Sequence, residues 1–402
     1  MNLPCLLVLG LSLAVAAGCA AKARDDGRAT PVLAADFQAD PLASGWTFTG
    51  GGKYGASFVW SKSDGRDGGA CLAVLPSANV PPGNGWESPP FPVSDRQYYR
   101  VTFGLKSARP IYWATSFYDS YGAMLEGDHH SQADAAEAWT PQEFCVKTKF
   151  PAATASVVFR TAAKEPMYID RVAVTPISHG EARAWADRFY IAMTPLVYAA
   201  PEGAGRLLPR TLERLRAGRP LRIAVLGDSI SNDLSNSPLD VLLEGAFPGC
   251  AVDVRFTGRG GTGWMKHRQQ IAERVARHEP DLVILLANSN EEEFLASTLG
   301  DILDGVRRLR PQADILLVTP HLKGWSDKPE AGLRHAEILR GVAADKHVEI
   351  LDLGAVWNAY LAASGRPQEY LLRDAVHMNE RGRQVSARAV VAHLAAANPQ
   401  AG

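Results

Sequence analysis

Two segments far apart in the chain carry side chains that could together attack an acyl carbonyl. Ser229 ends a Gly-Asp-Ser tripeptide directly after the apolar run 221–226, and a serine in such a strand-to-helix turn is exposed to substrate. Asp374 and His377 stand three residues apart near the C-terminus. The carboxylate can then accept a hydrogen bond from imidazole Nδ1, while Nε2 faces the serine. This pattern favours a serine nucleophile that is activated by a histidine base.

The elements that must position these residues alternate between apolar runs and helical stretches. Such alternation predicts a parallel sheet covered on both faces, with the site at the carboxyl ends of the strands. Ser231 stands where the Gly-x-Ser-x-Gly elbow has its second glycine, which disfavours the α/β-hydrolase superfamily. We predict strands at 221–226, 251–256, 281–287, 313–319 and 348–353, and helices at 269–278, 299–309, 332–346 and 380–396.

Two further blocks follow the second and third predicted strands. Residues 258–264 are rich in glycine, and residues 288–291 read Asn-Ser-Asn-Glu, with Asn290 in the third strand's loop. Together with Gly-Asp-Ser and Asp-x-x-His, in this order, the blocks resemble the SGNH (GDSL-type) hydrolase family. In that family the 288–291 block reads Gly-x-Asn-Asp, so Asn288 and Glu291 depart from it.

The resemblance implies a flavodoxin-like, three-layer α/β/α domain with a parallel sheet. It also implies two-step acyl transfer by a Ser-His-Asp triad. Ser229 would attack an ester carbonyl, His377 would take its proton, and Asp374 would hold the histidine tautomer. This mechanism requires no metal and no cofactor.

The resemblance further implies an oxyanion hole and a substrate pocket. The oxyanion donors would be the backbone N–H of Ser229, the backbone N–H of Gly263 and the side-chain amide of Asn290. Gly261 is the alternative to Gly263. Ordinary loop packing is the alternative for each candidate pocket residue, and these candidates are Trp264, His321 and Trp325.

The first half of the chain has a different character, with short apolar strands separated by Gly, Pro, Asn and Asp. This pattern predicts an all-β sandwich, and it resembles a jelly-roll carbohydrate-binding module. Trp113 and Tyr118 are the candidates for a sugar-stacking face, although a core position is the alternative for any tryptophan. His129 and His130 are adjacent, which is a poor spacing for a shared metal, and we expect them in a loop.

The sequence leaves two features of the sandwich undecided, a disulfide and a structural metal ion. In an exported protein Cys71 and Cys145, each in a predicted strand, could form a disulfide, and the alternative is two buried thiols. By analogy with carbohydrate-binding jelly rolls, the sandwich could also bind a structural calcium ion near Asp36 and Asp170.

The N-terminus predicts export. The apolar run 6–17 is the length of a signal-peptide core and too short to span a bilayer. Cys19 follows Ala-Ala-Gly, which resembles a bacterial lipobox, so we expect a lipoprotein of the cell envelope. Cleavage after Ala23 and simple secretion, to the periplasm or beyond, is the alternative. The predicted organisation is a signal peptide at 1–18, a linker at 19–30, the sandwich at 31–178, a helical connector at 179–218 and the hydrolase-like domain at 219–400.

The composition of the chain narrows the range of its binding partners. Lys and Arg total 42 against 43 Asp and Glu, which leaves no basic surface for nucleic acid. Only the lipid anchor would bring the chain to a membrane. We therefore expect an esterase that removes acetyl groups from a glycan. A lipase, thioesterase or broad esterase, a polysaccharide O-acetyltransferase, and a non-catalytic glycan-binding lipoprotein are the alternatives.

Overall fold

The computed structural model describes residues 29–48, 57–75, 85–125, 127–160, 165–286, 294–321 and 329–396. The predicted signal peptide and Cys19 lie outside these residues, as do Asn290 and Trp325. Within the described ranges, no helix combines the length and the apolar character needed to cross a bilayer.

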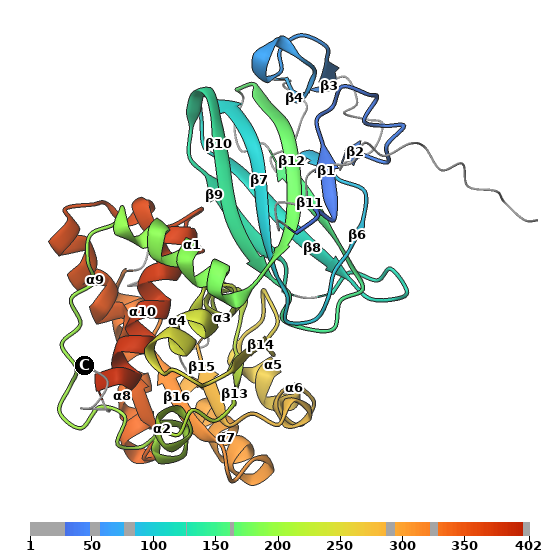
Figure 1. Cartoon of the computed structure of the whole chain (residues 1–402). Coiled ribbons are helices and arrows are strands. Elements are labelled where there is room, and N and C mark those ends of the chain that lie inside the picture. The colour runs from blue at the N-terminus through green and yellow to red at the C-terminus, as the bar shows by residue number, and fades with distance from the viewer. Residues whose placement is uncertain are drawn as a thin grey trace, which may run out of the picture.

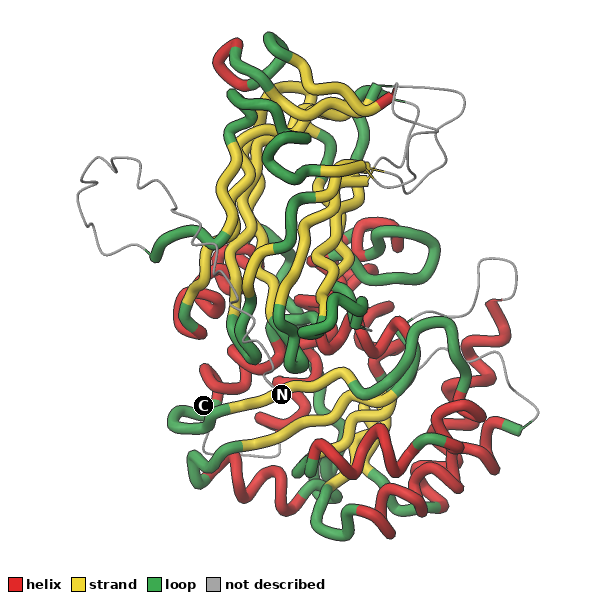
Figure 2. The backbone as a smooth tube through the Cα atoms, turned by 90° about the vertical axis from the view of Figure 1, so that its right-hand side faces the viewer, coloured by secondary structure: helices red, strands yellow, loops and turns green. Residues whose placement is uncertain are grey.

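The first half of the chain forms two antiparallel sheets, as the strand pattern predicts (Figures 1 and 2). One sheet has the order β10-β7-β12-β4-β3 with β1 beside β12, and the other has the order β2-β5-β11-β8-β9 with β6 beside β11. Val101, Phe103 and Leu105 of β7 enter the core at the two-residue period of a strand. The strands are β1 (Leu33–Ala35), β2 (Thr47–Phe48), β3 (Phe58–Ser61), β4 (Cys71–Val74), β5 (Gly85–Glu87), β6 (Phe91–Pro92), β7 (Tyr98–Ser107), β8 (Ile111–Tyr118), β9 (His129–Ala133), β10 (Ala136–Lys147), β11 (Thr154–Arg160) and β12 (Met167–Ile177).

Cys71 and Cys145 do not form the disulfide that the sequence leaves possible, because both cysteines are free and buried, which is the alternative. Cys71 lies on β4 and Cys145 on β10, and strands β12 and β7 separate them in the sheet. Three inter-strand steps of about 4.8 Å place the two backbones roughly 14 Å apart. A disulfide requires Cα atoms within about 7 Å. Burial raises the pKa of the Cys71 thiol to about 12, so this side chain stays a protonated, apolar core group.

The second half of the chain contains a parallel sheet in the order β14-β13-β15-β16-β17. This order is the flavodoxin-like one that the resemblance implies. The predicted helix at 269–278 is divided, because Gln270 separates two short helices and a 3-10 turn follows. The elements are α1 (His179–Ile191), α2 (Pro209–Arg216), β13 (Leu221–Leu226), α3 (Ser229–Ser235), α4 (Leu239–Ala246), β14 (Val252–Phe256), α5 (Trp264–Gln269), α6 (Ile271–Val275), β15 (Leu282–Leu285), α7 (Leu295–Leu309), β16 (Asp314–Val318), α8 (Pro329–Asp345), β17 (Glu349–Leu351), α9 (Leu353–Ser364) and α10 (Glu380–Ala396).

Both faces of this sheet are covered, as its near-continuous apolar strands require. Leu282 and Ile284 of β15 pack in a cluster with α4, α9 and α10. Val283 and Leu285 of the same strand pack in a second cluster with α5, α6, α7 and α8. Figure 2 shows the sheet between its helices, with the sandwich on one side. Because the helices cover the two faces of the sheet, the carboxyl ends of its strands remain available for a functional site.

A glycine is required where β13 leaves the sheet. Gly227 has φ +154°, and a Cβ at this position would lie 1.8 Å from the carbonyl oxygen of Leu286. Any larger residue would push the end of β13 away from β15. The turn that presents Ser229 therefore depends on this glycine.

The two halves pack through α1, α3, α4 and α10 (Figure 1). Val241 of α4 and Trp185 of α1 belong to the same apolar cluster as the sandwich core. Beside them, Asp240 is buried, and it accepts hydrogen bonds from Tyr98 Oη at 2.5 Å and from Lys147 Nζ at 2.6 Å. A buried charge pair at this position ties the orientation of the sandwich to α4.

Replacement of Asp240 should therefore destabilise the protein strongly. Asp240→Ala leaves the Lys147 ammonium buried without its partner, which costs about 3–5 kcal/mol. Urea unfolding followed by tryptophan fluorescence would measure the loss. Asp134→Ala is the matched control, because the Asp134–Arg381 pair also joins the two halves but Asp134 is 62% exposed. The control should lose less than about 1 kcal/mol. Equal losses in the two variants would contradict the inferred role.

Candidate functional site

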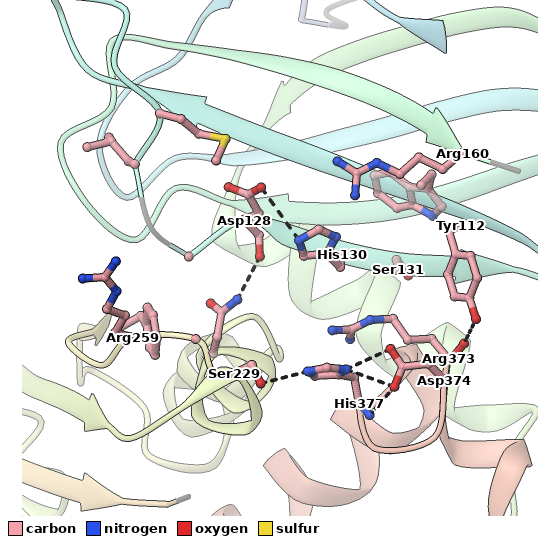
Figure 3. A pocket seen from close by; sticks show the side chains of 17 residues that line it. Tyr112, Asp128, His130, Ser131, Arg160, Ser229, Arg259, Arg373, Asp374 and His377 are labelled. Carbon is pink, nitrogen blue, oxygen red and sulfur yellow. Dashed lines mark hydrogen bonds and ion pairs between the residues drawn. The ribbon is translucent and has the colours of Figure 1, made fainter. Parts of the chain in front are cut away.

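Ser229, His377 and Asp374 form one hydrogen-bonded chain (Figure 3). His377 Nε2 lies 2.8 Å from Ser229 Oγ, and His377 Nδ1 lies 2.8 Å from Asp374 Oδ2. Partial burial opposes ionisation of Asp374. Hydrogen bonds from the His377 side chain and from the backbone N–H groups of Val376 and His377 outweigh it and lower the Asp374 pKa to about 2. The carboxylate is therefore charged at neutral pH and holds the imidazole with Nε2 toward the serine.

The serine is placed by the start of α3. Asp228 is the N-cap residue, and its carboxylate accepts a hydrogen bond from the Ile230 N–H at 2.8 Å. Ser229 is the first helical residue, and only Gly227 and Asp228 separate it from the end of β13. A serine held in this way can attack an acyl carbonyl while the histidine removes its proton.

Asp233 is a positioning residue that sequence reasoning missed. It lies one turn after Ser229 on α3 and is fully buried. Its Oδ1 accepts a hydrogen bond from Arg373 Nη1 at 2.6 Å, and its Oδ2 accepts one from the Met378 N–H at 2.9 Å. These two bonds hold both ends of the loop that carries His377. The sequence does contain a signal for this residue, because an acidic side chain four residues after Ser229 lies on the same face of a helix as the serine.

Arg383 of α10 extends this cluster into the sandwich. Its guanidinium donates to Asp233 Oδ1 at 2.8 Å, to Glu380 Oε1 at 2.8 Å and to the backbone carbonyl of His130. Glu380 Oε1 in turn lies 3.1 Å from Nε2 of His129. Burial opposes the charge on Asp233, but Arg373 and Arg383 hold the Asp233 pKa well below its usual range. The cluster is therefore ionised within the protein interior.

The triad opens into a pocket of about 810 Å³ that both halves of the chain line. This volume lies within the range of small-molecule sites. Figure 3 shows Tyr112, Asp128, His130 and Arg160 of the sandwich across from Ser229 and His377. His129 and His130, which we expected in a loop, belong to β9, and His129 packs inward. The sandwich thus forms a wall of the site.

The glycine that faces Ser229 differs from the one expected. Gly263 is the N-cap of α5 and is absent from the described pocket lining. Gly260 lines the pocket, and a Cβ on it would lie 3.7 Å from Ser229 Cβ. Gly261, the alternative, has φ +67° and follows in the same turn. A block of three closely spaced glycines does not indicate which one turns toward the nucleophile.

Two of the expected pocket residues lie elsewhere. Trp264 begins α5, and its fully buried side chain belongs to the apolar cluster under α7. His321 is buried behind the catalytic loop, where its Nε2 donates to the Val376 carbonyl at 3.0 Å. Both side chains were expected beside the substrate because they follow strand ends, but helix and loop packing turn them inward.

The remaining sequence candidates have separate outcomes. Asn290 and Trp325 lie outside the described residues, so their roles stay predictions. Trp113 is fully buried but lines the pocket, whereas the Tyr118 hydroxyl donates to Glu87 at 3.0 Å.

Calcium near Asp36 and Asp170 also stays a prediction, and the surroundings do not favour it. The two Asp170 carboxylate oxygens accept hydrogen bonds from the N–H groups of Arg66 and Arg171, at 2.9 and 2.7 Å. Across the described part of the chain, no three metal-binding side chains gather.

The charge on Glu380 should make stability depend on pH. Burial opposes this charge, but Arg383, His129 and Ser131 lower the Glu380 pKa to about 2 from its usual 4.5. A lowered pKa adds stability above pH 4.5, and this contribution is lost as the pH falls toward 2. The stability difference between wild type and Glu380→Gln should therefore shrink over that range, as thermal unfolding at several pH values would measure. In Glu213→Gln, which removes an exposed carboxylate, unfolding should differ from wild type by less than about 0.5 kcal/mol. A difference for Glu380→Gln that is constant with pH would contradict the prediction.

Comparisons with known proteins bear on the α/β domain. Residues 225–385 match the model of the GDSL-like Lipase/Acylhydrolase family. No curated protein matches the chain. Among solved structures, Axe2, an acetylxylan esterase from Geobacillus stearothermophilus, is 19% identical with a TM-score of 0.38, over 43% of this chain and 94% of its own. The acetyl xylan esterase AlAXEase is 18% identical with a TM-score of 0.39, over 43% of this chain and 98% of its own.

Proposed function

We propose that the protein is an exported serine esterase that removes O-acetyl groups from glycans, and the match of residues 225–385 to the GDSL-like Lipase/Acylhydrolase family model supports an ester hydrolase. The observation that carries the proposal is the hydrogen-bonded chain Ser229–His377–Asp374 at the floor of a pocket shared with the sandwich.

The geometry supports a two-step acyl transfer. Ser229 Oγ attacks the ester carbonyl as His377 Nε2 takes its proton, and the imidazolium then gives that proton to the leaving sugar hydroxyl. Water, deprotonated by the same nitrogen, then attacks the acyl-enzyme, and the imidazolium returns that proton to Ser229 Oγ as acetate leaves. Asp374 remains ionised and stabilises the imidazolium throughout.

The negative oxygen of the tetrahedral intermediate needs donors beside Ser229. We assign this role to the backbone N–H groups of Ser229 and Gly260, with the Asn290 amide as the donor expected from the family. Gly260 replaces Gly263 in this assignment because it is the glycine that packs against the serine. Each such donor typically contributes about 10²–10³ in kcat.

The pocket lining supports a sugar ester with a short acyl group. Its described walls combine apolar side chains, among them Leu125 and Phe256, with charged ones from both domains, among them Asp128, Arg160 and Arg259. A long acyl chain against these charged groups would displace the water that hydrogen-bonds them, and it would offer no hydrogen bonds in return. A hydroxyl-rich ring can supply those bonds, which favours a glycan.

Acetate release should test the proposal directly. The panel would comprise acetylated xylan, pectin and chitooligosaccharides, with p-nitrophenyl acetate as a small ester. We expect the wild type to release acetate from at least one glycan. Asp374→Asn should lower kcat about 10⁴-fold, because an amide no longer holds His377 in the tautomer whose Nε2 can accept the serine proton. Ser229→Ala should lower kcat about 10⁶-fold.

Ser63→Ala is the control, since Ser63 is exposed in the sandwich. It should retain wild-type rates. Equal acetate release by wild type and Ser229→Ala from every substrate, together with no hydrolysis of p-nitrophenyl acetate by the wild type, would refute the esterase assignment.

Export and anchoring are part of the same proposal, supported by the apolar run 6–17 and the lipobox-like Cys19. Expression with radiolabelled palmitate in a bacterium should label the wild type. Cys19→Ser should lose the label, because the thiol that carries the lipid is gone, whereas Cys5→Ser should change it little. Labelling that survives Cys19→Ser would exclude this anchor.

A further inference from the structure

The sandwich wall of the pocket contains a carboxylate oxygen without a partner. Asp128 directly precedes β9, and its Oδ2 accepts a hydrogen bond from Ser116 Oγ at 3.2 Å. Its Oδ1 is buried and has no hydrogen-bond partner among the residues that the structure describes. A buried carboxylate oxygen in this state is costly, so it calls for a donor from outside the described protein.

The position of Asp128 relative to Ser229 is fixed by α3. The Asp128 backbone carbonyl accepts hydrogen bonds from the side-chain amides of Asn232 and Asn236, at 3.0 and 3.1 Å. Asn232 lies one helical turn after Ser229. The free Oδ1 is therefore held by the same helix that presents the nucleophile.

Unpartnered donors line the same pocket. Trp113 is fully buried, and its Nε1–H has no partner within the described ranges. Arg160 at the end of β11 is partly buried, and its Nε likewise has no partner within the described ranges. One acceptor and two donors around a single cavity match a ligand that carries several hydroxyl groups, because each hydroxyl both donates and accepts.

We propose that Asp128, Trp113 and Arg160 form a subsite for the sugar ring of the substrate, in which Asp128 accepts the hydroxyl next to the acetylated one. This inference rests on the proposed function and names the substrate class as a glycan that is neutral at the position next to the acetylated hydroxyl. If a uronate carboxylate took the place of that hydroxyl, its negative charge would lie against the Asp128 carboxylate and be repelled. A second acetyl group there would remove the donor, so mono-acetylated sugars are preferred over vicinal di-acetylated ones.

Binding to an inactive protein tests the subsite without any reaction. Ser229→Ala would be titrated with xylotetraose, cellotetraose, mannotetraose and tetragalacturonate, and saturation-transfer NMR would detect bound sugar. At least one neutral tetrasaccharide should bind. Adding Asp128→Ala should weaken that binding about 10- to 100-fold, the range for a hydrogen bond to a charged group. Failure of all three neutral sugars to bind, or binding that is unaffected by Asp128→Ala, would overturn the subsite.

Kinetics then distinguish a role in recognition from a role in folding. For Asp128→Ala and Asp128→Asn, kcat/KM would be measured on the mono-O-acetylated tetrasaccharide that binds and on p-nitrophenyl acetate. The ratio of glycan to small-ester kcat/KM should fall at least about tenfold. Losses in equal proportion would mean a structural role and would overturn the proposal, as would no loss. Asp67→Asn is the control, because Asp67 is an exposed sandwich carboxylate that pairs with Arg171.

The outcomes separate this inference from the proposed function. Sugar binding that depends on Asp128, without acetate release by the wild type, would refute the deacetylase and support the subsite. Acetate release that depends on Ser229 but not on Asp128 would support the deacetylase and refute the subsite.

Discussion

The carboxylate of Asp233 links Ser229 to His377, the proposed nucleophile and its proposed base, and the arrangement of the site follows from this link. Asp233 shares α3 with Ser229, and it holds the loop of His377 through Arg373 and the Met378 N–H. The triad residues come from chain positions about 150 apart, yet the Ser229–His377 bond is 2.8 Å long. A proton transfer needs that distance within a few tenths of an ångström. Fully buried, ionised hydrogen bonds supply such precision because they are short and directional.

The same carboxylate makes the sandwich part of the site. Arg383 bonds both Asp233 and the backbone of β9, so the strand that follows Asp128 is tied to the helix of the nucleophile. Tyr112 adds a hydrogen bond to the Arg373 carbonyl from the neighbouring strand. A module that only tethered the enzyme to a polymer would need none of these contacts. The sandwich instead supplies one wall of the cavity that contains Ser229 and His377.

Local signals in the sequence predicted the α/β half well, since strand–helix alternation and the Gly-Asp-Ser and Asp-x-x-His blocks lie at element ends. What they could not predict depends on long-range packing. Cys71 and Cys145 both lie in strands, but the alternation of a strand says nothing of its order in the sheet. Trp264 follows glycines, as a pocket residue would, yet it begins α5 and faces the core. Asp128 reaches Asn232 across 104 positions, and no local pattern encodes that contact.

The near-zero net charge acquires a structural meaning from these contacts. The chain has 42 basic and 43 acidic side chains, and several of them pair inside the domain interface, where Asp233, Glu380 and Arg383 are buried together. An apolar interface of the same size would tolerate sliding, because hydrophobic contact is not directional. In the proposed function, a sugar bound between the two domains needs its ester placed against Ser229 while its hydroxyls meet Asp128. Directional charged bonds across the interface fix both partners at once, so the electrostatic interactions align the two domains rather than attract a charged substrate from a distance.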